Sequence, residues 1–61
     1  MTTGARVYAI NAIHYDGGVR VIHKGGKGTV VHALGSTLYV RWDWTGDTYP
    51  TDAHHLGSLE R

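Results

Sequence analysis

The residues best suited to chemistry in this chain form a short basic loop, residues 24–27 (KGGK). Glycine lets backbone amides approach an anion closely, and the flanking ammonium groups attract it, as in contacts with nucleic-acid phosphates. Two further cations, Arg20 and Arg41, strengthen this attraction if the fold brings them to the same side. We therefore predict nucleic-acid binding by Lys24, Lys27, Arg20 and Arg41. The alternative is that the two lysines only keep a turn hydrated.

Aromatic side chains are the second chemical signal, because the chain has two Trp and four Tyr but no Phe. A folded domain of this size buries about one Trp and one Tyr, so the others are expected at the surface. Trp44 follows the inward-facing Trp42 by two residues and stands where the strand enters a turn, which favours exposure at a binding surface. The predicted aromatic surface is Trp44, Tyr49, Tyr39 and Tyr15. These rings can stack on bases, cage a cation or pack on a partner, or Trp44 can cap the open end of the barrel.

The five histidines do not predict a metal site. Zn²⁺ normally takes four tetrahedrally placed ligands, and the side chains of the adjacent His54 and His55 are expected to diverge. His14 and His23 lie near turns, where solvated polar residues are ordinary. We expect no bound metal, although several histidines close together would respond to pH near about 6.5.

Catalytic chemistry has little support in the sequence. There is no Cys, and the aspartates at 43, 47 and 52 occupy positions typical of turns and caps. Ser36 and Ser58 lack a recognisable relation to a His and an Asp. We therefore expect no cofactor and no enzymatic activity. An enzyme would need a pore shared between subunits, because one barrel of 61 residues cannot enclose an ordinary substrate pocket.

Length and composition indicate a single domain spanning residues 1–61, with residues 1–4 as a flexible polar lead. A chain this short buries only about 60% of its extended surface, and without Cys no disulfide supplements the core. Barrel closure or self-association as a homo-oligomer is expected to help. The net charge of +1 is below the strongly basic balance of proteins that grip phosphates by charge alone. No signal peptide or apolar run of membrane-spanning length is present, so we expect a cytoplasmic protein with no membrane partner.

Alternating Val, Ile, Leu and Tyr separated by glycine turns predict a small antiparallel sheet that curls into a barrel. The expected strands and hairpin arms are residues 5–10, 13–15, 19–22, 28–34, 37–42, 48–49 and 56–59. Residues 16–18 (DGG) make the turn of a projecting hairpin, and Gly35-Ser36 fits a two-residue turn with glycine first.

Strict alternation also predicts which side chains share a face. In residues 28–34 we expect one face to carry Val30, His32 and Leu34 and the other to carry Thr29, Val31 and Ala33. In residues 37–42 the inward set is Leu38, Val40 and Trp42.

The last third of the chain contains a proline that indicates an edge strand, and its strand pattern then gives way to a helical turn. Pro50 cannot donate to a strand ladder, so its strand ends there or lies at an edge. Thr51 or Asp52 can then cap a single helical turn at residues 53–55. A final strand at residues 56–59 follows this turn.

Apart from the two hairpin arms at residues 13–15 and 19–22, five strands remain, with one short helical turn before the last. This order resembles that of SH3-like barrels. Within them, residues 19–22 (VRVI), 24–27 (KGGK) and 28–31 (GTVV) follow one another as in the KOW segment of ribosomal and transcription-elongation proteins. KOW loops commonly contact RNA or protein. The resemblance therefore implies an interaction surface at Lys24 and Lys27.

Two other branches are similar over shorter stretches. Residues 40–43 (VRWD), followed by a turn and an aromatic, look like Tudor-like modules, which use aromatic cages to hold methylated cations. Tyr49-Pro50 and the closing residues 56–61 (LGSLER) resemble plasmid-borne type II dihydrofolate reductases, which share an active-site pore between subunits. Of that family's Val-Gln-Ile-Tyr active segment only Tyr49 is kept here. We therefore expect no reductase activity.

Together these patterns predict a non-enzymatic interaction module that binds nucleic acid or a nucleoprotein through the basic glycine loop and exposed aromatics. The near-neutral charge leaves open a protein-binding or self-assembling module. In that case Trp44 and Tyr49 would fill a groove, as SH3 surfaces do for extended proline-rich peptides.

Overall fold

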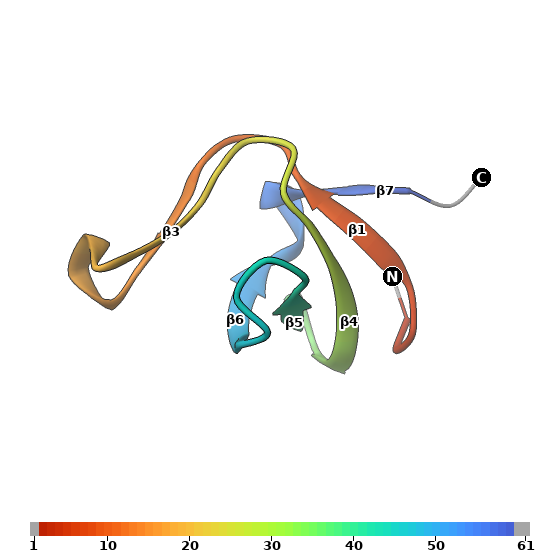
Figure 1. The fold of residues 1–61 in the computed structure, drawn as a ribbon. Coiled ribbons are helices and arrows are strands. Elements are labelled where there is room, and N and C mark those ends of the chain that lie inside the picture. Colours follow the sequence, from red (N-terminus) through yellow and green to blue (C-terminus); the bar gives the residue numbers. More distant parts are fainter. Residues whose placement is uncertain (1, 60–61) are drawn as a thin grey trace.

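Two antiparallel sheets contain all the strands within residues 2–59, which are the residues that this computed structural model describes (Figure 1). The large sheet has the strand order β6-β5-β4-β1-β7, with β1 at Arg6–Ala9, β4 at Lys27–Leu34, β5 at Thr37–Trp42, β6 at Thr48–Asp52 and β7 at Leu56–Ser58. The small sheet pairs β2 (Ile13–Tyr15) with β3 (Arg20–Ile22) across the 3-10 turn η1 (Asp16–Gly18), and a second 3-10 turn, η2 (Ala53–His55), precedes β7. The predicted all-β antiparallel architecture, with a helical turn before the last strand, is confirmed.

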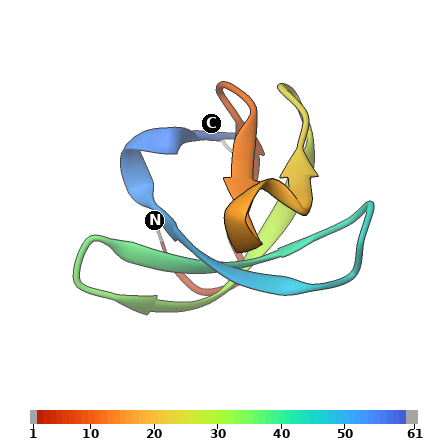
Figure 2. The same cartoon turned by 90° about the vertical axis from the view of Figure 1, so that its left-hand side faces the viewer.

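The large sheet is strongly curled, as the two perpendicular views show (Figures 1 and 2). Its central strands are β5, β4 and β1, while β6 and β7 are its two edges. Within residues 2–59 no strand pairing joins these two edges. The observed architecture is therefore a curled open sheet with a hairpin, and closure into a barrel is not observed.

The β2–β3 hairpin is the predicted projecting arm, and it extends to one side of the large sheet in Figure 1. Ile13 pairs with Ile22 and Tyr15 with Arg20. Gly17 and Gly18 in its turn have φ angles of 66° and 96°, which glycine adopts at no steric cost. The sequence of this turn therefore fixes where the chain reverses.

The faces predicted for β4 are wrong beyond Val30, because a β-bulge interrupts the strand. The register passes from Val30↔Val40 to His32↔Tyr39, so Val31 is an extra residue without a direct partner. His32 consequently shares the outer face with Tyr39, and Ala33 lies opposite the buried Leu38. One inserted residue reverses the side-chain alternation that a strict period of two assumes.

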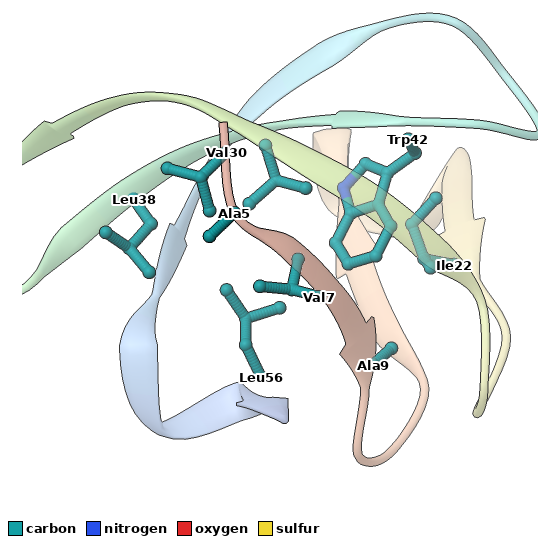
Figure 3. Close-up of a cluster of buried hydrophobic side chains, with 9 residues drawn as sticks. Ala5, Val7, Ala9, Ile22, Val30, Leu38, Trp42 and Leu56 are labelled. Atoms are coloured by element: carbon teal, nitrogen blue, oxygen red, sulfur yellow. The ribbon is translucent and has the colours of Figure 1, made fainter. Parts of the chain in front are cut away.

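The core lies on the inner face of the curled sheet and extends to the base of the hairpin (Figure 3). It consists of Ala5, Val7, Ala9, Ile22, Val30, Leu38, Val40, Trp42 and Leu56. Leu38, Val40 and Trp42 point inward as predicted. Gly28 makes room for the indole of Trp42, because a Cβ at this position would lie 2.7 Å from Cγ1 of Val40 and 3.0 Å from the Trp42 ring.

The β4–β5 turn and the edge strand follow the local sequence signals. Leu34 pairs with Thr37, and within the turn between them only Gly35 has a positive φ, 62°, as the predicted glycine-first turn requires. β6 continues through Pro50 and is an edge strand, where a missing N–H is tolerated. Asp52 is the N-cap residue of η2, although its side chain makes no capping hydrogen bond.

The described part of the N-terminal lead is hydrogen-bonded to the sheet. The Gly4 N–H donates to the Val30 carbonyl at 2.6 Å, and the Ala5 N–H donates to the Thr2 carbonyl at 3.0 Å. Met1 of the predicted flexible lead, and residues 60 and 61 of the closing LGSLER motif, lie outside the described residues.

Candidate interaction surface

The outer face of the large sheet carries a cluster of charged side chains. Arg6 pairs with Thr29, and Thr29 pairs with Arg41, so both arginines lie on the face opposite the core. Nη1 and Nη2 of Arg6 lie 2.9 and 2.5 Å from the two carboxylate oxygens of Asp43, and Nη1 lies 2.7 Å from the Thr29 hydroxyl. Lys27, two residues before Thr29, shares this face. We call Arg6, Lys27, Arg41 and Asp43 the cation cluster.

Interactions within the cation cluster shift the pKa values of Asp43 and Arg6. The hydrogen-bonded Arg6 guanidinium is the main reason why the pKa of Asp43 lies below its ordinary value of 3.8, and the charges of Arg41 and Lys27 lower it further. The Arg6 pKa is raised, chiefly by the same hydrogen bond with Asp43. Because the carboxyl pKa is depressed, its contribution to stability is present above its ordinary value and is lost as the pH falls through the lowered one. Above about pH 4 the cluster holds three cations around one carboxylate.

The glycine amides of the basic loop are already used within the protein. The Gly25 N–H donates to the Ala9 carbonyl at 2.8 Å, and the Gly26 N–H donates to the His23 carbonyl at 2.9 Å. These two amides are therefore not available to an anion, and this part of the sequence interpretation is wrong. Lys24 and Lys27 are both exposed. Their ammonium groups are what the loop offers to an anion.

Trp44 lies at the tip of the tight turn between β5 and β6. The Gly46 N–H donates to the Trp42 carbonyl at 2.7 Å, the Trp42 N–H to the Asp47 carbonyl at 3.0 Å, and the Asp43 N–H to the Lys27 carbonyl at 2.9 Å. The first two bonds close the turn, and the third holds it against the start of β4. The side chain of Trp44 is left 93% exposed, whereas Trp42, two residues earlier, is 1% exposed.

Trp44 borders a pocket of about 130 Å³. The pocket is lined by Val21, Ile22, His23, Gly26, Lys27, Trp42 and Trp44. We call it the Trp44 pocket. Lys27 belongs both to this pocket and to the cation cluster. An apolar cavity, an exposed indole and a set of cations therefore meet at one end of the sheet.

Tyr15 and Tyr49, predicted as surface aromatics, form a contact between the hairpin and the sheet. Their rings are stacked, with centroids 4.3 Å apart and planes 12° apart. The Tyr15 hydroxyl hydrogen-bonds to the Thr51 hydroxyl and accepts a bond of 3.3 Å from the indole N–H of Trp42. Both tyrosines are half-buried. This aromatic contact fastens the hairpin to the body of the protein.

Charged side chains surround the outer edge of that contact. They are Asp16, Asp47 and Arg20, the last of the four cations predicted to bind nucleic acid. The Tyr49 hydroxyl lies 3.5 Å from a carboxylate oxygen of Asp16. The pKa of Tyr49 is raised, mainly by burial and then by the charges of Asp16 and Asp47. Nη2 of Arg20 lies 3.7 Å from a carboxylate oxygen of Asp47. Arg20 is thus placed on the hairpin beside a carboxylate, and it is not part of the cation cluster.

Tyr39, the remaining predicted aromatic, is half-buried on the outer face of β5. Its ring centroid lies 5.7 Å from that of His32, with the planes tilted by 47°. Lys27, Arg41 and Trp44 are thus the predicted residues that the fold brings to one end of the sheet, and Lys24 lies on the adjoining turn.

Sequence reasoning missed Arg6 and the pocket-lining residues Val21 and His23. Arg6 lies 37 positions before its partner Asp43 in the chain. Their contact depends on β1 and β5 both pairing with β4 in one register. The alternation of residues 5–10 places Arg6 and Tyr8 on one face, but only the sheet order shows which cations share that face.

The turn before β7 gathers three groups with metal-ligating atoms. The candidate ligand atoms of Asp52, His54 and His55 all lie within 4.8 Å of one another. The two imidazole centroids are 4.2 Å apart, with planes tilted by 40°. The expectation that these adjacent histidine side chains diverge is therefore wrong.

Comparison of the chain with protein-family models, curated proteins and solved structures finds no match. In residues 2–59 no helix is long and apolar enough to cross a membrane. The geometry described above is therefore the basis for a functional assignment.

Proposed function

We propose that this protein is a non-enzymatic interaction module that binds single-stranded nucleic acid, free or within a nucleoprotein. The observation that carries the proposal is the 93% exposed Trp44 beside Lys27 at the edge of the cation cluster. A base can stack on an exposed indole whatever its identity, while neighbouring cations hold the phosphates. This pairing of a stacking platform with cations is the physical requirement for binding single strands with little sequence preference.

The distribution of charge supports this reading better than the net charge of +1 does. The cation cluster has three cations and one carboxylate, a formal +2, and Lys24 on the adjoining turn raises this to +3. The remaining aspartates lie elsewhere, with Asp16 and Asp47 beside the Tyr15–Tyr49 contact and Asp52 at the end of β6. The chain is thus nearly neutral as a whole, yet one face is distinctly basic.

We also propose that this curled, open sheet is arranged as in an SH3-like barrel. Three features of the large sheet support this: β1 pairs with β7, β4, β5 and β6 follow one another as neighbours, and a 3-10 turn separates β6 from β7. The hairpin inserted between β1 and β4 takes the place of the long first loop of such barrels. Its position beside the Trp44 pocket, through Val21 and Ile22, gives the surface a second wall.

A second candidate function is a protein-binding or self-assembling module. The observation that favours it is the apolar lining of the Trp44 pocket, together with the exposed side chains of Val19 (82%) and Leu34 (64%). A partner bound in this way would bury Trp44 without needing the cations. Salt dependence therefore separates the two functions.

The test is fluorescence anisotropy of a labelled single-stranded oligonucleotide titrated with protein at about 50 and 200 mM salt. With about three phosphate contacts, the single-strand slope of roughly −0.7 per contact predicts binding about twentyfold weaker at the higher salt. Salt-insensitive binding, or none at high micromolar protein, would overturn the proposal. Concentration-dependent burial of Trp44 without oligonucleotide would then favour self-assembly.

Matched variants assign the binding to this surface. Trp44→Ala removes the stacking platform and is expected to weaken binding by about 1–3 kcal/mol. Arg41→Gln is expected to reduce both affinity and salt slope, whereas Arg20→Gln removes the same charge from the hairpin and is the control. Equal losses for the two arginine variants would show that net charge, and not the cation cluster, drives binding.

A further inference from the structure

The groups at the β6–β7 connection lie apart from the surface proposed above. Asp52, His54 and His55 are all exposed, and their candidate ligand atoms lie within 4.8 Å of one another. None of the three lines the Trp44 pocket or belongs to the cation cluster. The nucleic-acid proposal therefore gives these residues no role.

The backbone that carries these side chains is fixed at both ends. The Ala53 N–H donates to the Ser36 carbonyl at 3.1 Å, and the His55 carbonyl accepts from the Ile10 N–H at 3.1 Å. The Leu56 N–H closes η2 on the Ala53 carbonyl, and the flanking Thr51 and Leu56 are buried. A short turn tied to two other segments holds the backbone of these three residues at constant spacing. This lowers the entropy that a ligand must remove when it orders them.

The donor set selects a class of ion. Two imidazole nitrogens and one carboxylate oxygen suit divalent ions of intermediate softness such as Zn²⁺, whereas Mg²⁺ and Ca²⁺ favour all-oxygen sites and Cu(I) favours sulfur. Tetrahedral Zn²⁺ with bonds of about 2.0–2.1 Å places its ligand atoms roughly 3.3 Å apart. Binding requires the present span of up to 4.8 Å to close to that distance by side-chain rotation, which exposure leaves unobstructed at all three residues.

We propose that Asp52, His54 and His55 form a three-ligand site for a divalent transition-metal ion of the Zn²⁺ class, with water completing the coordination. The three-dimensional contact that supports this is the approach of the two imidazoles to 4.2 Å, with the Asp52 carboxylate beside them. The remaining coordination positions face solvent, because all three side chains are exposed. Such a site accepts a further ligand from outside the chain.

The test is isothermal titration of the purified, untagged protein with Zn²⁺. One ion per chain is expected, and His54→Ala, His55→Ala and Asp52→Asn are each expected to weaken binding. Loss of an outer-shell partner alone costs about 10–100-fold in metal affinity, so loss of a ligand is expected to cost at least tenfold. His14→Ala is the matched control, because His14 is an exposed histidine on β2.

The surface position of the three side chains keeps the variants interpretable. Exposed substitutions leave the core intact, and an unchanged circular dichroism spectrum checks this for each variant. Nitrogen chemical shifts of the His54 and His55 imidazoles, followed during the titration, report ligation directly. The proposal is overturned if His54→Ala binds Zn²⁺ as the unaltered protein does. It is also overturned if His14→Ala loses binding equally, or if two chains share one ion.

Discussion

The two tryptophans of this protein lie in opposite surroundings, Trp42 within a packed aromatic contact and Trp44 at the surface. The contact formed by Tyr15, Tyr49 and Trp42 is closed: the tyrosine rings stack at 4.3 Å, and the Trp42 indole N–H donates to the Tyr15 hydroxyl. Trp44, two residues beyond Trp42, is 93% exposed, and within residues 2–59 its indole N–H has no hydrogen-bond partner. One region packs the hairpin against the sheet, and the other is open to solvent, as the proposed binding surface requires.

In this protein, hydrogen bonding of the polar atoms distinguishes the packed aromatic side chains from the exposed one, whereas residue type does not. A buried indole N–H or phenol without a partner is costly, so a structural aromatic keeps its hydrogen bonds inside the protein. Trp44 instead exposes both its ring and its N–H to solvent. Folding gains little from such a side chain, which is consistent with the binding role that we propose for it.

The largest expected effect is on stability when the two tryptophans are truncated separately. Trp42→Ala removes the largest buried side chain of the core and is expected to cost about 3–5 kcal/mol, whereas Trp44→Ala is expected to change stability by less than about 0.5 kcal/mol. A core of this size rarely supplies more than about 3–5 kcal/mol, so the Trp42 variant should be largely unfolded. Urea denaturation followed by circular dichroism measures both.

A fluorescence measurement sharpens the same comparison without unfolding the protein. Trp44→Phe leaves only the buried Trp42, so the emission should shift to the blue relative to the unaltered protein. A cost above about 2 kcal/mol for Trp44→Ala would contradict the assignment, because it would mean that the indole packs on the fold.

Local signals in the sequence predicted the elements well, because most turns are specified by the residues that make them. Gly17-Gly18 and Gly35 supply positive φ angles in the two hairpin turns, and Asp16 adds one more in the first of them. The Asp-Ala-His-His run at residues 52–55 supplies the turn before β7. Alternation also identified Trp42 as inward-facing. Each of these features depends on neighbours in the chain.

The candidate surface was only partly predictable, because it depends on pairing between distant strands. A strict alternation of side chains does not predict the bulge at Val31, which places His32 on the outer face. The Arg6–Asp43 ion pair follows from the sheet order, which no local pattern reports. Tyr15 and Tyr49 read as surface aromatics in sequence, and only the position of the hairpin shows that they stack on each other.

A smaller effect is expected when one hydroxyl is removed from the closed contact. Tyr15→Phe deletes the acceptor of the Trp42 N–H bond and the partner of Thr51, which is expected to cost about 1–2 kcal/mol. Tyr39→Phe removes a hydroxyl from the outer face and is the control, expected within about 0.5 kcal/mol. Urea midpoints for the two variants give the comparison. Equal costs would show that the Tyr15 hydroxyl does not fasten the hairpin.

The smallest expected effect is a dependence of stability on alkaline pH that originates in the closed contact. Burial and the carboxylates of Asp16 and Asp47 raise the pKa of Tyr49 above its ordinary value of 10.0. As the pH rises above that value, the unfolded chain loses the Tyr49 proton first, while the folded protein retains it. The folded state then binds more protons than the unfolded one, so its stability falls as the pH rises.

Urea midpoints at about pH 9 and about pH 11 measure this dependence, and the difference between the unaltered protein and Tyr49→Phe isolates one phenol from the other titrating groups. The variant should lose less stability over this interval than the unaltered protein. Asp16→Asn should give an intermediate loss, because it removes one of the two carboxylates that raise the Tyr49 pKa and leaves the burial in place. If all three proteins lose stability equally, the Tyr49 phenol is as well solvated in the folded protein as in the unfolded chain. The closed contact would then resemble the exposed Trp44 more than the core, and the distinction between the two aromatic regions would fail at its outer edge.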